Sequence, residues 1–463
     1  MSTTFGAKIV AARAVGGLVR RTGRGGGTSL PGKVLIRLEP HAIGELSARL
    51  IRGSAVISAT NGKTTTATMT ASIMDRAGIR LVHNRAGANM AGGIASTLLA
   101  SARRRGRIDG ELGLFEVDEF WLDRVTAELR PRAVLLANLF RDQLDRYGEL
   151  ETIADRWAAV VAGLPADTRL ILGADDPLIA DLGRGREQVT LFGIEDPEVA
   201  VPEMQHASDS KHCRRCGAAY QYELIYLGHL GRYSCPACGQ RRPDPEVRAE
   251  QIHLEGTSAA SFDLVTPSGA QRVNLPLPGL YNVYNALAAA ALCLELGVSL
   301  ADVVAGLESA TAAFGRAERI RVGDVELSIL LIKNPAGANE ILRTVALEPG
   351  EIDALAILND GTADGRDVSW VWDADFELLA PHIRSVTCSG SRAAELALRL
   401  KYAGVPIERV RVVPALDQAL DIALARAAGG RLFALPTYTA LLALHEELAA
   451  RGHVAPYWAE LAA

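Results

Sequence analysis

The stretch Ser58-Ala-Thr-Asn-Gly-Lys-Thr-Thr-Thr66 follows an apolar run that begins at Ala55 and precedes a predicted helix. A glycine-containing turn between a strand and a helix offers backbone N–H groups to an anion, and the helix N-terminus adds partial positive charge. Lys63 would then reach the β- and γ-phosphates of a nucleotide, and the Thr64 hydroxyl would reach Mg²⁺. Only the Gly-Lys-Thr half fits the general phosphate-loop pattern, because Ile57 stands where that pattern has glycine. The alternative is a plain turn before a helix, but the flanking elements favour an ATP site formed by Thr60, Asn61, Gly62, Lys63, Thr64 and Thr65.

Outward from this loop, predicted strands and helices alternate along the chain. Helices are expected near 63–78 and 150–163, with strands near 112–117, 131–137 and 188–193. This alternation predicts a doubly wound, mostly parallel α/β sheet. A second α/β series starts at about residue 329, and a chain of 463 residues exceeds what one core usually supports. We place an N-terminal basic segment at 1–39, in which a short basic helix precedes a glycine-rich loop over 20–32. A central ATP-binding domain is placed at 40–318 and a Rossmann-like C-terminal domain at 319–463.

The overall charge and hydropathy exclude some classes of protein. The net charge of -5 and the pI near 6.0 give no general attraction to nucleic acid or to an anionic bilayer. The most apolar N-terminal stretch, 6–19, is interrupted by Lys8 and Arg13, and no run reaches the roughly 18 apolar residues that a membrane span requires. These features predict a cytoplasmic protein without a transmembrane segment.

A carboxylate follows the predicted strand near 112–117. Mg²⁺ bound with a nucleotide usually takes one or two carboxylates and keeps water and phosphate oxygens as its other ligands. Glu116 stands at the end of that strand, with Asp118 and Glu119 as neighbouring substitutes. We expect Glu116 and Thr64 to hold Mg²⁺, although an exposed acidic cluster is the alternative.

Two pairs of cysteines interrupt the α/β alternation. Cys213-Arg-Arg-Cys216 and Cys235-Pro-Ala-Cys238 are separated by 18 residues, and a glycine follows each pair. This spacing is typical of a four-thiolate zinc ribbon, which leaves no open position for water and is therefore structural. We interpret 205–245 as a zinc-binding insertion in the central domain. Nearby arginines leave nucleic-acid binding open as an alternative.

Several segments resemble the Mur ligase and folylpolyglutamate synthase superfamily. The phosphate loop is similar to that family's Gly-Thr-Asn/Lys-Gly-Lys-Thr/Gly loop, with Ala59 in place of the first glycine. Asn138-Leu-Phe-Arg-Asp-Gln-Leu-Asp-Arg-Tyr-Gly148 resembles its Thr-Asn-x-x-x-Asp-His-Leu-Asp-x-x-Gly motif, with Gln143 in place of a metal-binding histidine. The resemblance implies ATP-dependent acylation, with nucleotide contacts from Asn282, Asn285 and Arg316. In amino-acid-adding members a carbamylated lysine often holds a second Mg²⁺, yet no lysine lies between Lys63 and Lys211.

The C-terminal segments resemble one branch of that superfamily, the ligase subunits of lipid II isoglutaminyl synthases. The resemblance rests on Ile332-Lys-Asn-Pro335, Asp364-Gly-Arg-Asp-Val-Ser-Trp370 and Thr437-Tyr-Thr-Ala440, together with the cysteine insertion. It implies that ATP activates the α-carboxylate of D-glutamate in the lipid II stem peptide as an acyl phosphate. Ammonia from a separate glutaminase subunit, GatD, would then give D-isoglutamine at the inner face of the membrane.

The same resemblance implies that a C-terminal aspartate completes the partner's Cys/His pair. Asp367 is our first choice and Asp373 our second, although a loop or helix-cap role is the alternative for Asp367. Two rival functions remain open from the sequence. One is an amino-acid-adding ligase of the Mur or folylpolyglutamate type, and the other is a zinc-ribbon NTPase that binds nucleic acid.

Overall fold

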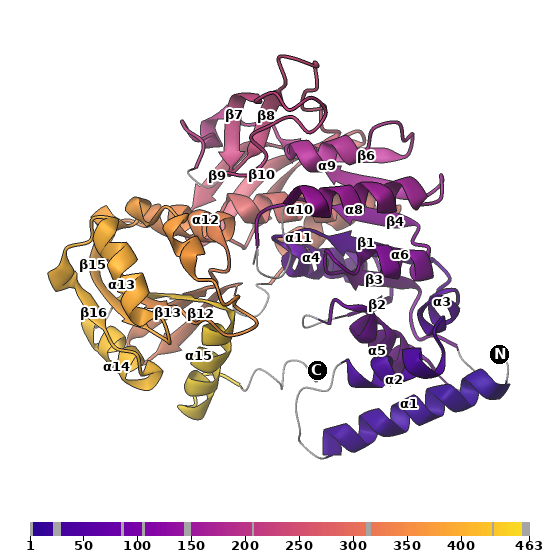
Figure 1. Ribbon diagram of the computed structural model, residues 1–463, viewed down its shortest axis with the longest axis horizontal. Helices are drawn as coiled ribbons and strands as arrows, with labels where there is room; N and C mark the ends of the chain where they lie inside the picture. Colours follow the sequence, from indigo (N-terminus) through magenta and orange to yellow (C-terminus); the bar gives the residue numbers. More distant parts are fainter. Residues whose placement is uncertain are drawn as a thin grey trace.

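The computed structural model describes residues 3–21, 29–84, 88–103, 107–142, 150–205, 208–311, 316–427 and 430–455. Two sheets organise these residues, and Figure 1 shows them as two bodies, one from the first two thirds of the chain and one from the last third. The fold is α/β, as the strand and helix alternation predicted.

The larger sheet has nine strands in the order β11-β10-β9-β6-β5-β4-β1-β3-β2. From β2 to β9 neighbouring strands run parallel, and β9, β10 and β11 form an antiparallel edge. The strand β1, which leads into the phosphate loop, lies inside the parallel part between β3 and β4. The strands are β1 Ser54–Ser58, β2 Leu81–His83, β3 Leu112–Glu116, β4 Ala133–Leu136, β5 Arg169–Gly173, β6 Val189–Ile194, β9 Val247–Glu255, β10 Ala259–Thr266 and β11 Gly269–Leu275.

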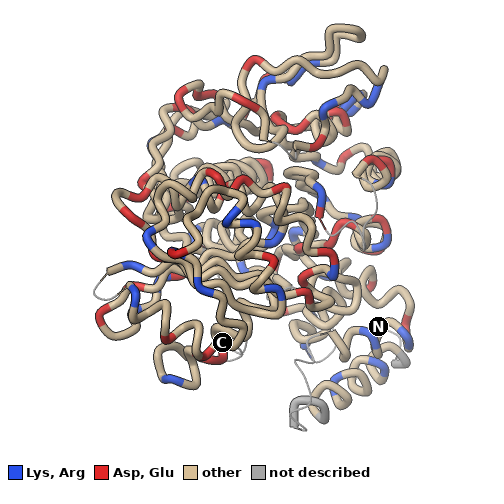
Figure 2. Tube along the Cα trace, turned by 60° about the vertical axis from the view of Figure 1, so that its left-hand side comes forward, with Lys and Arg blue, Asp and Glu red and all other residues tan. Residues whose placement is uncertain are grey.

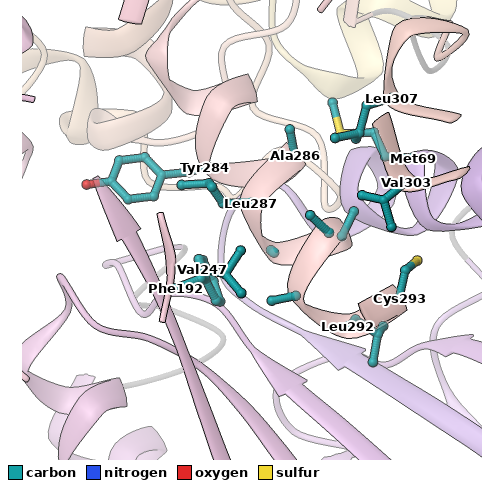
Figure 3. Close-up of a cluster of buried hydrophobic side chains, with 14 of the residues drawn as sticks. Met69, Phe192, Val247, Tyr284, Ala286, Leu287, Leu292, Cys293, Val303 and Leu307 are labelled. Carbon is teal, nitrogen blue, oxygen red and sulfur yellow. The ribbon is translucent and has the colours of Figure 1, made fainter. Parts of the chain in front are cut away.

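Helices cover both faces of this sheet. Successive residues of a strand point to opposite faces, so each strand contributes side chains to two separate cores. Ala55 and Ile57 of β1 face one core, and Val56 between them faces the other. The first core is closed by α4 Lys63–Arg76, α10 Leu280–Glu295 and α11 Leu300–Glu308. Figure 3 shows the side chains of α10 packed between the sheet and the helices α4 and α11. The second core is closed by α1 Thr3–Arg21, α2 Leu30–Leu38, α3 Ala42–Ser47, α5 Ala91–Ser101, α6 Leu122–Leu129, α8 Leu150–Gly163 and α9 Pro177–Leu182.

The cysteine insertion (205–245) leaves the large sheet after β6 and returns at β9. It contains the antiparallel hairpin β7 Gln221–Leu227 and β8 Leu230–Ser234, and the short helix η2 Pro197–Val199 precedes it. Its small core consists of Cys213, Tyr220, Tyr233 and Cys235. The cysteine end of the insertion therefore has a small core of its own, whereas Tyr226, Leu227 and Leu230 of the hairpin belong to the first core of the large sheet.

The C-terminal sheet has the strand order β12-β13-β17-β14-β15-β16. Only β12 and β13 are antiparallel to each other, and the other neighbours are parallel. The elements are β12 Arg316–Val322, β13 Val325–Leu330, α12 Pro335–Ala346, β14 Ile352–Ile357, η3 Ser369–Trp372, η4 Phe376–Leu378, η5 Ala380–His382, β15 Ile383–Ser389, α13 Ala393–Tyr402, η6 Ile407–Arg409, β16 Val410–Val412, α14 Leu416–Arg426, β17 Arg431–Pro436 and α15 Tyr438–Ala450. Again one core lies on each face of the sheet.

The structure differs from the sequence predictions at a few elements. We expected a short basic helix and then a loop over 20–32, but α1 has 19 residues and α2 begins at Leu30. Among the elements that were not predicted are the strands β2, β9, β12 and β16 and the helices α5, α6, α11 and α15. In β9 the sequence Val-Arg-Ala-Glu-Gln-Ile-His-Leu-Glu is largely polar, because part of this strand faces solvent. Among the described helices, none is long and apolar enough to cross a membrane.

Candidate active site

The phosphate loop connects a fully buried strand to the start of α4. All five residues of β1 are buried, and α4 begins at Lys63 directly after Gly62. Gly62 has a φ of 85°, in the left-handed region that favours glycine. A Cβ at this position would lie 1.9 Å from Oδ1 of Asn285, so the close approach of α10 also requires glycine here.

Lys63 is buried inside the loop that it closes. Its ammonium group donates to the carbonyl oxygens of Ala59 and Thr60 and to Oε2 of Glu119 at 3.0 Å. Burial raises the pKa of the Glu119 carboxyl, and the positive charges of Lys63 and Lys333 oppose that shift. A lysine held in this way at a helix N-terminus can exchange its carboxylate for phosphate oxygens without leaving the loop.

Acidic side chains gather beside Lys63 at the carboxyl end of β3. Glu116, Asp118 and Glu119 are all buried, and with Thr64 they line a cavity of about 1420 Å³. The side chain of Asn84 fixes the backbone of Glu116, accepting from its N–H at 2.9 Å and donating to its carbonyl oxygen at 2.8 Å. The two predicted Mg²⁺ ligands, Thr64 and Glu116, therefore line one cavity.

The C-terminal part of the chain forms the opposite wall of this cavity. Asn61 of the phosphate loop accepts from Nδ2 of Asn334, the residue that caps α12, at 3.0 Å. Asn138 holds Asn61 from the other side, because its Oδ1 accepts from the Asn61 N–H at 2.9 Å. Lys333 donates to Oδ2 of Asp142 at 2.5 Å. Residues far apart in the sequence thus meet at the phosphate loop.

Of the two asparagines predicted to contact the nucleotide, only Asn285 lines the cavity. Asn282 lies behind it and donates to the carbonyl oxygen of Pro278 at 2.8 Å. Asn285 donates to Asn282 at 3.1 Å, so Asn282 positions the residue that faces the cavity. Arg316 is the first residue of β12, but its side chain is outside the described part, as is Gln143. The role of Arg316 stays a prediction.

The C-terminal aspartates lie outside the lining of this cavity. Asp367 is exposed, and its Oδ1 accepts from the Ser369 N–H at 2.8 Å. Hydrogen bonds from the Ser369 side chain and backbone lower the pKa of Asp367. Asp373 instead lies 3.9 Å from Arg141 of the central part. Asp364 is buried and binds the N-terminus of α15 through the Thr439 N–H at 2.7 Å, which is a structural role.

The four predicted zinc ligands lie together. The sulfur atoms of Cys213, Cys216, Cys235 and Cys238 are all within 4.8 Å of one another. Gly217 and Gly239 turn the chain after each pair with φ values of 78° and 75°. The backbone N–H of Cys238 is the main cause that lowers the pKa of the Cys235 thiol, to about 6. Four convergent thiols can hold a metal ion.

Four of the five arginines of the insertion are paired with acidic side chains, and the fifth, Arg241, is exposed. Arg214 binds Asp155, Arg215 binds Asp181 and Arg232 binds Glu195. Arg242 binds both Asp175 and Glu195. Figure 2 shows basic and acidic positions mixed along the insertion at the top of the molecule. This arrangement leaves little unpaired positive charge from these four arginines for a polyanion.

The two α/β sheets and the lysine-bearing loop define a ligase of the Mur type. The chain matches the family models "Mur ligase middle domain" over 57–235 and "MurT ligase C-terminal" over 331–441. A relative from Streptococcus pneumoniae, named lipid II isoglutaminyl synthase (glutamine-hydrolyzing) subunit MurT, is 33% identical over 97% of this chain and 98% of its own length. The MurT subunit of Staphylococcus aureus N315 is 33% identical over 91% of this chain and 93% of its own length. The chain belongs to the MurT family.

Solved structures of similar fold agree with that assignment. A pseudomurein peptide ligase type C from Methanothermus fervidus superposes with a TM-score of 0.67 at 22% identity, covering 88% of this chain and 80% of its own. MurF from Acinetobacter baumannii gives a TM-score of 0.65 at 20% identity, covering 91% of this chain and 80% of its own. At this level of identity the likeness concerns the fold.

Sequence reasoning missed some residues that shape the site. Asn84 was not considered, and neither were Asp209 and His229 of the insertion, which contact the loop after β4. No spacing rule identifies them, because each acts on a residue at least 30 positions away in the chain. Asp142 and Asn334 were part of quoted motifs, but nothing in the sequence indicated their partners.

Proposed function

We propose that this chain is the ligase subunit of an amidotransferase that converts the D-glutamate of the lipid II stem peptide to D-isoglutamine. The observation that carries the proposal is the cavity shared by Lys63, the buried acidic cluster and the start of α12, in a chain that matches MurT relatives over nearly its full length. The names of those relatives describe a glutamine-hydrolysing synthase subunit acting on lipid II. The product and the partner that we propose for this chain are inferred from its similarity to these relatives and from the geometry of the cavity.

ATP would bind with its phosphates at the N-terminus of α4, where Thr60, Asn61, Gly62, Lys63, Thr64 and Thr65 converge. The ammonium group of Lys63 would exchange its contact with Glu119 for phosphate oxygens and stabilise the charge of the transferring phosphoryl group. The substrate carboxylate attacks the γ-phosphorus and yields an acyl phosphate and ADP. Ammonia then attacks the acyl carbon, and phosphate leaves. The contact of Asn334 with Asn61 joins the C-terminal part to the phosphate loop, and closer approach of the two parts would keep out water that could hydrolyse the acyl phosphate.

Mg²⁺ fits the residues on this wall of the cavity. Glu116 offers a buried carboxylate at the strand end, and Thr64 offers a hydroxyl from the first turn of α4. When bound, Mg²⁺ would neutralise charge on the nucleotide phosphates. Because Asn84 fixes the backbone of Glu116, this ligand is held in place before the metal arrives. Asn285, positioned by Asn282, and Arg316 are our proposed nucleotide contacts besides the loop.

The ammonia source would be a separate glutaminase subunit, GatD, docked on the C-terminal part. Trp372 and Tyr402 are 48% and 69% exposed, and their ring centroids lie 5.8 Å apart. Trp372 ends η3, the short helix whose first residue, Ser369, donates its backbone N–H to Asp367. Exposed aromatic side chains are enriched in protein–protein interfaces, so this surface is a candidate docking site. Asp367 would orient the partner's catalytic histidine, and Asp373 is less suited because Arg141 lies next to it.

The cysteine insertion would hold a structural Zn²⁺ through Cys213, Cys216, Cys235 and Cys238. The geometry weighs against the nucleic-acid alternative, because Arg214, Arg215, Arg232 and Arg242 are engaged with carboxylates of the same chain. An amino-acid-adding ligase remains the second candidate, since its fold is shared. The absence of a lysine between Lys63 and Lys211 disfavours it. We place the reaction in the cytoplasm, at the inner face of the membrane where lipid II is accessible.

Product mass tests the proposal directly. The chain, co-expressed with its glutaminase partner, is incubated with lipid II, ATP and glutamine, and the product is analysed by mass spectrometry. Amidation replaces OH by NH₂ and lowers the mass by about one dalton, with one ADP formed per product. A mass increase that corresponds to an added amino acid would establish the second candidate instead. Nucleic acid added in excess should leave the rate unchanged.

A further inference from the structure

The loop after β4, residues 138–142, is the point where three parts of the molecule meet. On one side it contacts the phosphate loop, because the N–H of Phe140 donates to Oγ1 of Thr60 at 3.0 Å and Asn138 binds Asn61. At its end, Asp142 accepts the hydrogen bond from Lys333 of the C-terminal part. Any displacement of this loop therefore changes both the phosphate loop and the opposite wall of the cavity.

The cysteine insertion holds the loop from the other side. The two carboxylate oxygens of Asp209 accept from the backbone N–H of Arg141 at 2.8 Å and from its Nε at 2.6 Å. The side chain of Asp209 is only 8% exposed. Charge-assisted bonds that fix both the backbone and the side chain of one residue restrict its position strongly. Arg141 directly precedes Asp142, so Asp209 determines where the partner of Lys333 lies.

A second contact comes from the tip of the hairpin β7–β8. The ring of His229, fully buried, packs on the ring of Phe140 with centroids 4.7 Å apart. Gly228 precedes it with a φ of 57°, and a Cβ there would lie 2.9 Å from the Phe140 ring. The tip of the hairpin thus approaches Phe140 too closely for any larger residue at 228. Phe140 itself lines the cavity.

The insertion also touches the C-terminal wall. Nη1 of Arg343 in α12 donates to the carbonyl oxygen of Tyr226 in β7 at 2.8 Å. Leu227 and Leu230 of the hairpin line the cavity together with Glu340 of α12. The hairpin therefore contacts the loop 138–142 and α12, which form opposite walls of the site. A purely peripheral brace would contact neither.

We propose that the cysteine insertion is a positioning element for the ligase site, and that Asp209 is its principal positioning residue. Through Arg141, Asp209 holds Asp142 in reach of Lys333, while His229 and Tyr226 fix Phe140 and α12. The four-cysteine cluster keeps the hairpin folded and so acts on the site at a distance. This inference rests on the proposed function for its kinetic consequence, but the contacts themselves can be tested without any substrate.

Amide hydrogen exchange gives the substrate-independent test, with full-length wild type, Asp209→Ala, Asp209→Asn and Asp181→Ala compared. Asp181 is the matched control, because its side chain is 10% exposed and it pairs with Arg215 across the same boundary. Asp209→Ala should speed exchange at 138–142 and at the start of α12, with metal content unchanged, whereas Asp181→Ala should not. Removal of the metal by a chelator should produce the same local change. Unaltered exchange in Asp209→Ala, or equal changes in both alanine variants, would refute the positioning role.

Kinetics of the complex then connect position to chemistry. In Asp209→Ala we expect kcat for lipid II amidation to fall about tenfold to a hundredfold, with a smaller rise in KM for ATP, because the lost bonds are charge-assisted and reach the phosphate loop only through residues 138–142. Asp209→Asn keeps one acceptor and should recover part of the rate. The double variant Asp209→Ala with Lys333→Ala should be no slower than Lys333→Ala alone, since both act through Asp142. If the double variant were slower than Lys333→Ala by the full factor lost in Asp209→Ala, Asp209 would not act through Asp142. A wild-type complex without amidation activity would instead count against the proposed function alone.

Discussion

Two groups of carboxylates, one at the phosphate loop and one in the loop 359–375 of the C-terminal part, show how burial determines the role of an acidic residue. Glu116, Asp118 and Glu119 are at most 8% exposed and line the same cavity as Lys63, whose ammonium group contacts Glu119. Asp367 is exposed, and Asp373 retains 48% of its side-chain surface. A buried carboxylate must be matched by a cation or a metal, whereas an exposed one is available to another protein. We therefore expect the two groups to serve two separable reactions.

The largest expected effect comes from Asp367→Asn in the complex with the glutaminase. If Asp367 orients the partner's histidine, glutamine hydrolysis should fall about ten-thousandfold, as loss of a triad carboxylate does elsewhere. Amidation with added ammonium chloride should stay at the wild-type rate, because the phosphate loop is untouched. Glutamate release and ADP formation measure the two reactions in parallel. Asp373→Asn is the matched variant, and normal glutamine hydrolysis by Asp367→Asn would transfer the role to Asp373.

Lys63→Met should produce the opposite pattern. Removing a preorganised charge at the transferring phosphoryl group should lower amidation about a hundredfold to a thousandfold, with glutamine or with ammonium chloride. Assembly with the glutaminase, measured by size-exclusion chromatography, should be unchanged. Lys8→Met is the control, because Lys8 forms a partly exposed pair with Glu39 on the N-terminal helices. If Lys63→Met retained amidation activity, the buried residues around the phosphate loop would not be the site of phosphoryl transfer.

Features formed by residues close in sequence were predicted well, whereas contacts between distant residues were not. The phosphate loop and the cysteine pairs were predictable, because a strand, a turn and a helix start, or two thiol pairs, are set by residues close in sequence. The strand end at Glu116 followed from the same local pattern. By contrast, the contacts of Asp209 with Arg141 and of Lys333 with Asp142 span 68 and 191 residues, and local patterns carry no information on them. The choice among the aspartates of 359–375 needed burial, which separates structural Asp364 from exposed Asp367.

Loss of the metal should have a smaller effect than either of these substitutions in the reacting groups. Cys216→Ser removes one of four thiolates, so the zinc content of the purified chain should fall from one equivalent towards zero. The hairpin β7–β8 would loosen, and the melting temperature should drop by several degrees. Cys388→Ala is the control, since Cys388 is buried in the C-terminal core and should leave the zinc content at one. Full zinc content in Cys216→Ser would contradict a four-cysteine site.

The smallest effect is expected for Asp360→Asn, at the exposed edge of the loop 359–375. The Ser391 hydroxyl and the Arg392 guanidinium lower the pKa of Asp360. The stabilisation from this carboxylate is therefore present above its unfolded-state pKa of about 3.9 and is lost as the pH falls through the lower folded-state pKa.

Solvent screens this pair, because the side chains of Arg392 and Asp360 keep 39% and 33% of their surface, so the loss at pH 7 should stay below about 0.5 kcal/mol. Urea unfolding of both forms at pH 7 and near pH 3.5, with and without added salt, measures it, and the difference should shrink with acid and with salt. A loss several times larger, unaffected by salt, would mean that this loop is as tightly constrained as the phosphate-loop acids. In that case exposure would no longer distinguish the two groups.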